Sequence, residues 1–264
     1  MNKNIHSMSC GSLVRFWRTK RKISQFDLSL QMSISARHLS FIETGKSKPS
    51  REMILKISDS LNVPLRHRNL LLIKAGFHAA FENKPLDDFK MRIIKEALNR
   101  VLEKHEPYPA MVVDFSYNVL MWNSSYQGII ESFTENKSLN KNQNAILMLF
   151  SKDGLRSSIQ DFNTIALFIL KRIWEEAASN QHDGLMDIFE KAQKMVNVDL
   201  PSSIETDRSL PLMTLNLQKN KNRCSLFSTI ASIGTPVDVT AQELRLELFF
   251  PADAESKIFL ENLK

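Results

Sequence analysis

The spacing of apolar residues over positions 1–75 of this 264-residue chain predicts five short helices. Leu13 and Trp17, for example, lie one helical turn apart and define the inward face of the first helix. Serine side chains cap helix N-termini and proline suits a first helical turn, so later helices are predicted to start at Ser24, Ser35, Ser50 and Pro64. Five helices spaced so closely along the chain predict a compact all-helical domain.

Two of these helices, within residues 24–45, are joined by a tight turn and predict a helix-turn-helix. Ser24 caps the first helix and Ser35 caps the second, which leaves Ala36 and Arg37 near the start of the second helix. Residues at that position meet base edges when a recognition helix lies in the major groove of DNA. The pattern therefore indicates a DNA-binding domain.

The apolar pattern changes beyond residue 80 and predicts a mixed domain. Residues 87–104 form an amphipathic helix that ends at Pro107 and serves as a connector. Strands are predicted at 111–115, 118–122, 212–218, 225–233 and 243–250, and helices at about 143–150, 161–179 and 184–196. Two strands, then helices, then three strands predict an antiparallel sheet with helices on one side, which is an α+β fold.

The last predicted strand shows the clearest alternation. Its apolar set is Leu244, Leu246, Leu248 and Phe250, and the set between them is Glu243, Arg245, Glu247 and Phe249. Because neighbouring side chains of a strand point to opposite faces, the first set is expected against the core and the second toward water. The sheet is therefore expected to have one buried and one solvated face.

Charge divides the chain in the same way. Residues 1–75 hold 14 Lys and Arg against 4 Asp and Glu, a balance of +10, so the net charge of +6 leaves 6 − 10 = −4 for the rest. A basic N-terminal part on a mildly acidic remainder is typical of a nucleic-acid-binding module with a separate regulatory body. We predict a DNA-binding domain over 1–80, a helical connector over 81–106 and a second domain over 107–264.

The remaining composition argues against several classes of protein. Cys10 and Cys224 are two isolated thiols, which favour a reducing cytoplasm over a disulfide framework or a zinc site. No N-terminal apolar stretch resembles a signal peptide, and the longest apolar run, 165–170, is too short to span a bilayer. We expect a cytoplasmic protein with no membrane insertion and no metal.

The sequence also lacks the common catalytic signatures. Its 7 glycines are each more than 20 residues apart, so there is no glycine-rich phosphate loop. Its 6 histidines include no His-Glu-x-x-His pair, and there is no Gly-x-Ser-x-Gly elbow. His105, Glu106 and Asp114 carry acid–base groups, but caps and turns at a domain junction explain them better. We expect neither catalysis nor a cofactor.

The N-terminal 75 residues resemble the Cro and phage-repressor class of helix-turn-helix proteins. A longer series of motifs resembles the MmyB-like transcription regulators over most of the chain, least between about 130 and 205. In the N-terminal part these motifs are Arg15-Phe-Trp-Arg18, Ser24-Gln25, Arg37-His-Leu-Ser-Phe-Ile-Glu-Thr-Gly45, Pro49-Ser-Arg-Glu-Met53 and Val63-Pro-Leu-Arg66. In the remainder they are His105-Glu-Pro-Tyr-Pro-Ala110, Phe227-Ser-Thr, Gly234-Thr-Pro and Glu243-Leu-Arg-Leu-Glu-Leu-Phe-Phe-Pro-Ala-Asp253.

The resemblance implies a PAS-like C-terminal domain that binds a small apolar ligand and can hold a long-chain fatty acid. Candidate pocket residues are the large apolar side chains of that half, namely Phe115, Met121, Trp122, Ile129, Ile146, Leu149, Phe150, Phe168, Phe227 and Phe249. A fatty acid also needs a polar anchor, for which the sequence offers Arg156, Arg172, Arg223 and Arg245 without choosing among them.

Two interpretations of the second domain follow. In the first, ligand occupancy modulates DNA binding through the connector helix. In the alternative, the second domain serves only dimerisation or protein docking.

Similarity to repressors also assigns roles within the helix-turn-helix. Gln25 is expected to hold a phosphate, and the guanidinium of Arg37 to grip guanine O6 and N7. Further base contacts are expected from Ser35, Ala36, Ser40 and Phe41, and phosphate contacts from Lys46, Lys48 and Arg51. Because one recognition helix reaches few base pairs, we expect a homodimer on half-sites about one turn apart.

Two internal features of the helical domain follow from the same comparison. Related repressors pair an arginine of the first helix with a glutamate late in the recognition helix, which implies an ion pair between Arg18 and Glu43. The family often has glycine in the turn between the motif's helices, where this chain has Ser33. If that turn needs a positive φ, Ser33 carries a modest strain.

Overall fold

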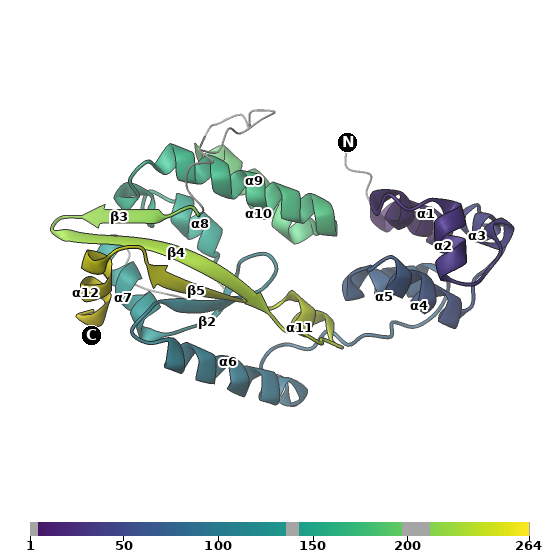
Figure 1. Cartoon of the computed structure of the whole chain (residues 1–264), viewed down its shortest axis with the longest axis horizontal. Helices are drawn as coiled ribbons and strands as arrows, with labels where there is room; N and C mark the ends of the chain where they lie inside the picture. Colours follow the sequence, from purple (N-terminus) through teal and green to yellow (C-terminus); the bar gives the residue numbers. More distant parts are fainter. Residues whose placement is uncertain (1–4, 136–142, 197–211, 264) are drawn as a thin grey trace. The chain divides into compact units, whose positions relative to one another are not determined.

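The computed structural model describes residues 5–135, 143–196 and 212–263 and divides into two compact units (Figure 1). The first unit, here called the head, comprises the chain up to residue 84 together with 235–242. The second unit, here called the body, comprises 85–234 and the chain from 243 onward. A short segment from the C-terminal half of the sequence therefore belongs to the head.

The head is built from five α-helices, as the apolar pattern predicts. They are α1 (Cys10–Lys20), α2 (Gln25–Gln31), α3 (Ala36–Glu43), α4 (Arg51–Ser60) and α5 (Leu65–Lys74), preceded by the 3-10 turn η1 (Ile5–Ser7). The predicted caps Ser24, Ser35 and Ser50 are confirmed, since each side chain accepts a hydrogen bond from a backbone N–H of its helix. Ser9 does the same for α1, which begins at Cys10, three residues before Leu13.

The five helices enclose a single apolar core. Leu13 and Trp17 of α1, predicted to face inward, are each 1% exposed. Around them are buried Leu28 of α2, Leu39 of α3 and Ile54 of α4. One well-packed cluster of this kind holds short helices that would be marginal in isolation.

The turn between α2 and α3 has a positive φ at Ser33, the position where the family often has glycine. Ser33 has a φ of 54°, in the left-handed region, and its side chain is exposed. Its N–H donates to the carbonyl of Leu30, and Ile34 N–H donates to Ser29, which closes the turn. A left-handed non-glycine residue costs roughly 1–2 kcal/mol. The turn is therefore formed at the expense of some stability.

The body is an α+β domain around a five-stranded antiparallel sheet, which confirms the predicted fold class. Its strands are β1 (Ala110–Val113), β2 (Val119–Trp122), β3 (Leu215–Lys219), β4 (Asn222–Ser232) and β5 (Arg245–Pro251), in the order β2-β1-β5-β4-β3. Asn220 and Lys221 form the turn between β3 and β4, and Asn220 adopts a φ of 54°.

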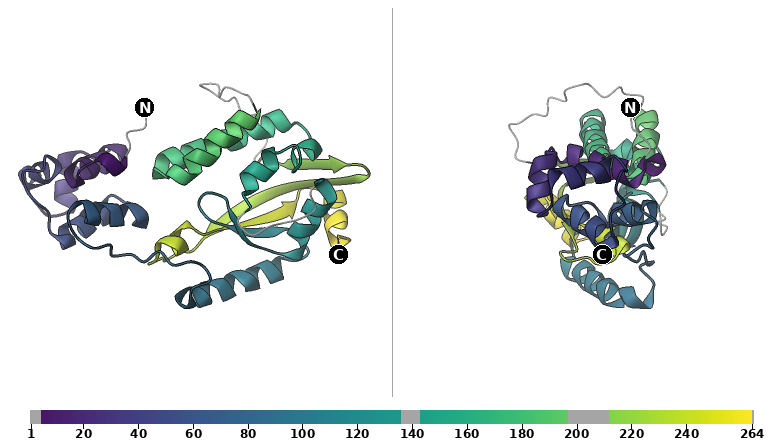
Figure 2. Two further views of the ribbon diagram at one scale, coloured as in Figure 1. Left: turned by 180° about the vertical axis from the view of Figure 1, so that it is seen from behind. Right: turned by 90° about the vertical axis from the view of Figure 1, so that its right-hand side faces the viewer.

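Helices lie on both faces of the sheet (Figures 1 and 2). The connector helix α6 (Arg92–His105) follows the 3-10 turn η2 (Phe89–Met91) and runs along one face, whereas α9 and α10 lie across the other. The remaining elements of the body are α7 (Ser124–Phe133), α8 (Ala145–Phe150), η3 (Arg156–Ser158), α9 (Phe162–Asn180), α10 (Asp183–Val196) and α12 (Ala254–Glu261). Neither α7 nor α12 is predicted by the apolar pattern. A final short helix, α11 (Val239–Glu243), lies between β4 and β5.

The expectation of a solvated face on β5 is wrong. Glu247 is 7% exposed, and the side chain of Arg245 is 14% exposed. Phe249 belongs to the same face and packs on the main core of the body. The alternation on β5 is real, but both of its faces are covered, because helices pack against the polar face as well. Polar groups are stable there only when hydrogen-bonded, as they prove to be.

The left-handed turn allows a stability test. Ser33→Gly should stabilise the head by about 0.5–1 kcal/mol, because relief of the left-handed strain outweighs the extra backbone freedom of glycine in the unfolded chain. Hydrogen exchange of the α2 and α3 amides in the full-length protein measures the change. Ser60→Gly, inside α4, is the matched control and should destabilise by about 0.5 kcal/mol. A Ser33→Gly protein with unchanged or lower protection would contradict the strain.

Candidate DNA-binding surface and ligand pocket

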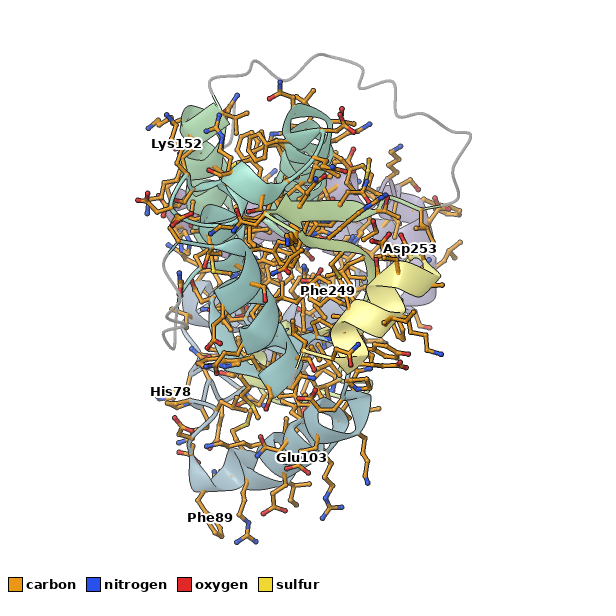
Figure 3. The ribbon with its side chains drawn as sticks, turned by 90° about the vertical axis from the view of Figure 1, so that its left-hand side faces the viewer. His78, Phe89, Glu103, Lys152, Phe249 and Asp253 are labelled. Carbon is orange, nitrogen blue, oxygen red and sulfur yellow. The ribbon has the colours of Figure 1, made fainter. Side chains whose placement is uncertain are left out.

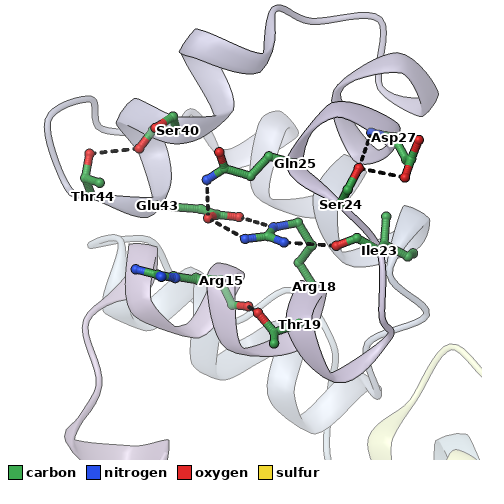
Figure 4. A network of polar contacts seen from close by, with 10 residues as sticks. All are labelled: Arg15, Arg18, Thr19, Ile23, Ser24, Gln25, Asp27, Ser40, Glu43 and Thr44. Carbon is green, nitrogen blue, oxygen red and sulfur yellow. Dashed lines mark hydrogen bonds and ion pairs between the residues drawn. The ribbon is translucent and has the colours of Figure 1, made fainter.

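The centre of the head is a buried carboxylate with three donors (Figure 4). Glu43, at the end of α3, is 5% exposed. Arg18 of α1 donates from Nε to Glu43 Oε1 at 2.6 Å and from Nη2 to Oε2 at 3.0 Å. Gln25 of α2 donates from Nε2 to Oε2 at 2.7 Å. One side chain thereby joins α1, α2 and α3.

Arg18 completes the network at the turn before α2. Its Nη1 donates to the carbonyl of Ile23 at 2.9 Å, so three nitrogens of the guanidinium are engaged. The hydrogen bond to Glu43 raises the pKa of Arg18 above its usual value, against the opposing effect of burial. The pair that similarity to repressors implied is therefore present as an internal brace.

The outer side of α3 carries the side chains expected at DNA. Ser35, Arg37, Lys46, Lys48 and Arg51 are exposed. The other candidates, half-buried, are Gln25, Ala36, Ser40 and Phe41. All nine come from the start of α2, from α3 with its cap, from the loop that follows α3, or from the first residue of α4. Their roles at bases and phosphates remain predictions.

An aromatic ring organises the exposed cations of this surface. The guanidinium of Arg37 lies 5.3 Å from the centroid of the Phe41 ring, and the Lys46 ammonium lies 5.8 Å from it. Cation–π contacts of this kind hold flexible side chains over a ring face. Phe41, considered in the sequence only as a base contact, thus also positions two of the predicted DNA ligands.

Other basic residues of the head have structural roles. Arg21 donates from Nε to the carbonyl of Leu61 and from Nη2 to that of Asn62, which satisfies the C-terminal end of α4. Lys56 donates to the carbonyl of Met32 at the end of α2. Cations at helix C-termini offset the dipole of the helix. The positive balance of the head therefore overstates the charge available to DNA.

A mostly apolar cavity lies in the body, between the sheet and helices α7, α8 and α9. It encloses about 920 Å³ of empty space, including the part that opens to solvent. Its lining residues are Pro109, Met111, Tyr117, Tyr126, Ile129, Ala145, Ile146, Met148, Leu149, Leu155, Ile165, Phe168, Ile169, Arg172, Met213, Leu215, Leu217, Leu226, Phe227, Ser228, Glu247 and Phe249. Phe249 lies in the interior of the body in Figure 3. Small-molecule sites are typically apolar cavities with a few polar groups.

Six of the ten candidate pocket residues line this cavity. They are Ile129, Ile146, Leu149, Phe168, Phe227 and Phe249. The other four, Phe115, Met121, Trp122 and Phe150, do not line it, so these assignments are corrected.

The four residues outside the cavity belong to other parts of the body. Phe115 is stacked on His182 with ring centroids 4.7 Å apart. Phe150 is fully buried core and packs against Phe162. Met121 and Trp122 belong to β2, one of the two edge strands of the sheet. The sequence shows their size and apolarity but not which side of the core each one faces.

The buried face of β5 carries a polar cluster. Arg245 donates to Glu176 Oε2 at 2.6 Å and to the hydroxyl of Tyr117 at 3.1 Å. Burial raises the pKa of Tyr117 to about 12. The Ser228 hydroxyl donates to Glu247 Oε1 at 2.8 Å. Burial also raises the pKa of the Glu247 carboxyl, although Arg172 and Ser228 act in the opposite direction.

The acid–base residues His105, Glu106 and Asp114 lie within the body and bind neighbouring backbone groups. His105 Nε2 lies 2.9 Å from the carbonyl oxygen of Phe249, and Glu106 accepts from the backbone N–H of Ser124 at 2.8 Å. Asp114 accepts from the N–H groups of two residues in the following turn, Ser116 and Asn118. Within the described residues, no three His, Cys, Asp or Glu side chains gather in a way that could hold a metal ion.

Models of known protein families match the sequences of both the head and the body. A model for the MmyB-like transcription regulator ligand binding domain matches residues 94–263, which is more than half of the chain. This chain belongs to the MmyB-like transcription regulators. A helix-turn-helix model matches residues 14–67 of the same regulator, which covers α2 and α3 and most of the head. No curated protein matches the chain.

The family assignment agrees with the geometry of this MmyB-like regulator. All the residues that line the cavity, like β1 to β5, lie within the region matched as a ligand-binding domain. The regulator is thus a DNA-binding transcription regulator with a C-terminal ligand-binding domain, and both matched families are non-enzymatic. Among its described residues, no helix combines the length and apolarity that crossing a membrane requires.

The brace at Glu43 can be tested with a double-mutant cycle. Arg18→Met should destabilise the regulator by about 3–5 kcal/mol, because it leaves a buried carboxylate without its main partner. Glu43→Gln should also destabilise, and the double variant should lose less than the sum, with a coupling energy of about 1–3 kcal/mol. Urea unfolding of the full-length protein gives these free energies.

An exposed ion pair provides the control for this cycle. Arg92 and Glu96, one turn apart on α6, approach to 3.6 Å with side chains 63% and 57% exposed. The same cycle on this pair should give a coupling energy of about 0.5 kcal/mol or less. Equal coupling in the two cycles would argue against a structural role for the Glu43 network.

Proposed function

We propose that this chain is a sequence-specific transcription regulator whose PAS-like body binds a long-chain fatty acid or similar apolar ligand and modulates DNA binding. The observation that carries the proposal is the exposed, serine-capped helix α3, held at its far end by the Glu43 brace. A helix fixed in this way presents its first turn as a rigid surface, which groove recognition requires. Its two buried free thiols suit a reducing cytoplasm.

In this proposal Arg37 reads guanine, because its guanidinium is exposed at the start of α3. Ser35, Ala36, Ser40 and Phe41 supply the neighbouring base contacts, and Gln25, Lys46, Lys48 and Arg51 hold phosphates. One amide hydrogen of Gln25 is engaged by Glu43, so its phosphate contact uses the other hydrogen or the backbone N–H.

A homodimer completes the DNA-binding proposal. One recognition helix covers only a few base pairs, whereas two copies cover half-sites about one turn apart. Two exposed apolar residues at the start of α6 support self-association, since Phe89 of η2 is 77% exposed and Ile93 of α6 is 76% exposed. Figure 3 shows Phe89 at the outer edge of the body, with its side chain directed outward.

A fatty acid suits the cavity of the body. Most of the lining is aliphatic or aromatic, with contributions from the strands and from three helices. The sequence order of the body, an antiparallel sheet interrupted by a helical insertion, is compatible with the PAS-like fold expected from the resemblance. An apolar cavity of this kind favours a ligand sensor over a domain that serves only dimerisation or docking.

The loop between β4 and β5 supplies a physical route for modulation. Ser228 of β4 and Glu247 of β5 line the cavity, yet the chain between these strands, residues 235–242, belongs to the head. β4 ends at Ser232 and β5 begins at Arg245, so only two residues at either end separate the strands from the head segment. A shift of the strands on ligand binding would therefore act on the head directly.

Specific hydrogen bonds fix this loop within the head. Gln242 Oε1 accepts from the N–H of Leu65 at 2.7 Å. Gln242 therefore satisfies a backbone donor at the start of α5, where the N-cap residue Pro64 forms no side-chain hydrogen bond. Asp238 Oδ2 accepts from the N–H of Lys84 at 3.3 Å. The N–H of Val239 donates to the Glu82 carbonyl at 2.8 Å.

DNA recognition is tested by comparing two substitutions. Arg37→Ala should lower affinity for a duplex selected from a random library by about 10- to 100-fold and relax the preference for one guanine. Lys48→Ala should weaken binding to selected and scrambled duplexes alike. For about 6 neutralised phosphates the wild-type slope of log K against log salt should be near −5, and Lys48→Ala should reduce its magnitude by about 1. Unchanged sequence preference in Arg37→Ala would refute the readout assignment.

Modulation is tested at the head loop. In the wild-type protein, added dodecanoate should change affinity for the selected duplex by about 5- to 150-fold. Asp238→Ala with Gln242→Ala should still bind dodecanoate, but the change in DNA affinity should fall to about twofold or less. Val237→Ala, at a loop residue that is 81% exposed, is the control and should keep the full effect.

Two outcomes count against this route. Full modulation in the double variant would exclude the loop as the connection. Dodecanoate binding without any effect on wild-type DNA affinity would favour the alternative, in which the body serves dimerisation or protein docking.

A further inference from the structure

The cavity contains one cation whose side chain has no polar partner. Arg172 of α9 lines the cavity, and its Nε atom is buried without a hydrogen bond. Its guanidinium lies 5.6 Å from the centroid of the Tyr117 ring. Within the described part of the chain, Arg172 forms no hydrogen bond or ion pair. Arg172 as a whole is half-buried, and its buried Nε is a polar group without a partner, which is costly unless an acceptor joins it.

The other three arginines that the sequence offered as anchors are engaged elsewhere. Arg245 is held by Glu176 and Tyr117 and lies over the ring of Phe115 at 4.2 Å. Arg156 donates to the carbonyl of Met195 at 2.9 Å. Arg223 is 55% exposed and faces Glu255 at 3.9 Å. None of the three lines the cavity.

The nearest acidic group of the cavity does not supply the missing anion. Glu247 also lines the cavity, but no contact within 4.0 Å joins it to Arg172. Its Oε1 accepts from Ser228 at 2.8 Å, and burial raises the pKa of its carboxyl, although Arg172 and Ser228 act in the opposite direction. Glu176, one turn from Arg172 on α9, is paired with Arg245. Both carboxylates therefore have hydrogen-bond partners of their own, whereas Arg172 has none among the described residues.

On the basis of the proposed apolar pocket, we propose that Arg172 is the headgroup anchor and selects an anionic, carboxylate-bearing chain over a neutral chain of equal length. The carboxylate accepts from the guanidinium of Arg172, and the hydrocarbon tail occupies the apolar part of the cavity between the sheet and α8. Glu247, which accepts from the Ser228 hydroxyl, lies in the same lining. Charge-assisted hydrogen bonds made away from water are stronger than neutral ones, which gives the selectivity.

Paired ligands that differ only in the headgroup test the anchor. Displacement of a fluorescent apolar probe from the full-length protein gives the affinities of dodecanoate and 1-dodecanol. Wild-type protein should prefer dodecanoate by about 10- to 100-fold. Arg172→Met should bind both with similar affinity, because it keeps an unbranched apolar side chain and removes the charge. Arg172→Lys should keep part of the preference.

Matched variants separate the anchor from general effects on the fold. Arg156→Met removes a cation outside the cavity and should leave the preference unchanged. Glu247→Gln mimics the protonated carboxyl and should bind dodecanoate at least as tightly as wild type. A dodecanoate affinity at least tenfold lower in Glu247→Gln would refute the assignment, because the carboxyl itself would then be the ligand's partner.

The failure of the anchor and the failure of the pocket give different results. Equal binding of dodecanoate and 1-dodecanol by wild type, or a preference that survives in Arg172→Met, would overturn the anchor and leave the apolar pocket in place. Binding of neither compound by wild type would overturn the proposed pocket and the anchor with it.

Discussion

The head depends on one buried charge. Glu43 comes at the last turn of α3, and without partners a carboxylate that is 5% exposed would destabilise the fold by several kcal/mol. Arg18 and Gln25 supply those partners from α1 and α2, so the three helices are fixed by the same two oxygen atoms. Apolar packing alone tolerates small shifts of one helix against another, whereas this geometry does not. The exposed side of α3 gains its rigidity from the opposite side of the helix.

The body uses buried polar groups in a different way. Arg245, Glu176 and Tyr117 satisfy one another, and Ser228 satisfies Glu247, so most of the polar face of β5 is internally complete. Arg172 differs from these groups in its hydrogen bonding. Their polar atoms have partners within the fold, whereas Arg172 lines the cavity and its buried Nε has no partner. A buried group without a partner in an otherwise satisfied cluster is where a binding function is expected.

The sequence predicts local structure well where one residue decides it. Ser24, Ser35 and Ser50 mark helix starts because a hydroxyl at that position satisfies a backbone N–H, and this chemistry is independent of the rest of the chain. The left-handed turn at Ser33 is different, because its expectation comes from the glycine that the family often has at that position. The serine caps locate the head and its exposed helix from the residues alone.

Features that depend on packing are not visible in the sequence in this way. Glu247 alternates with leucines on β5 and is therefore assigned to a solvated face, yet helices cover it. Phe150 and Phe168 are equally large and apolar, but only Phe168 lines the cavity. Such differences depend on which side of a helix meets the sheet, and the periodicity of one segment contains no information on its neighbours. The family resemblance predicts that a pocket exists, whereas only the folded structure identifies the residues that line it.

The inserted loop makes the head a discontinuous domain. Residues 235–242 are far along the chain, yet they complete the start of α5 and the segment after it. A fragment cut after residue 84 would therefore lack a strip of its own surface, and Leu65 would lose the acceptor of its N–H. The same constraint applies to recombination between relatives. Exchange of the N-terminal part at a single crossover would combine α5 of one protein with the 235–242 loop of the other. The DNA-binding half can thus be exchanged intact only together with these eight residues, which are encoded about 150 codons downstream of its main part.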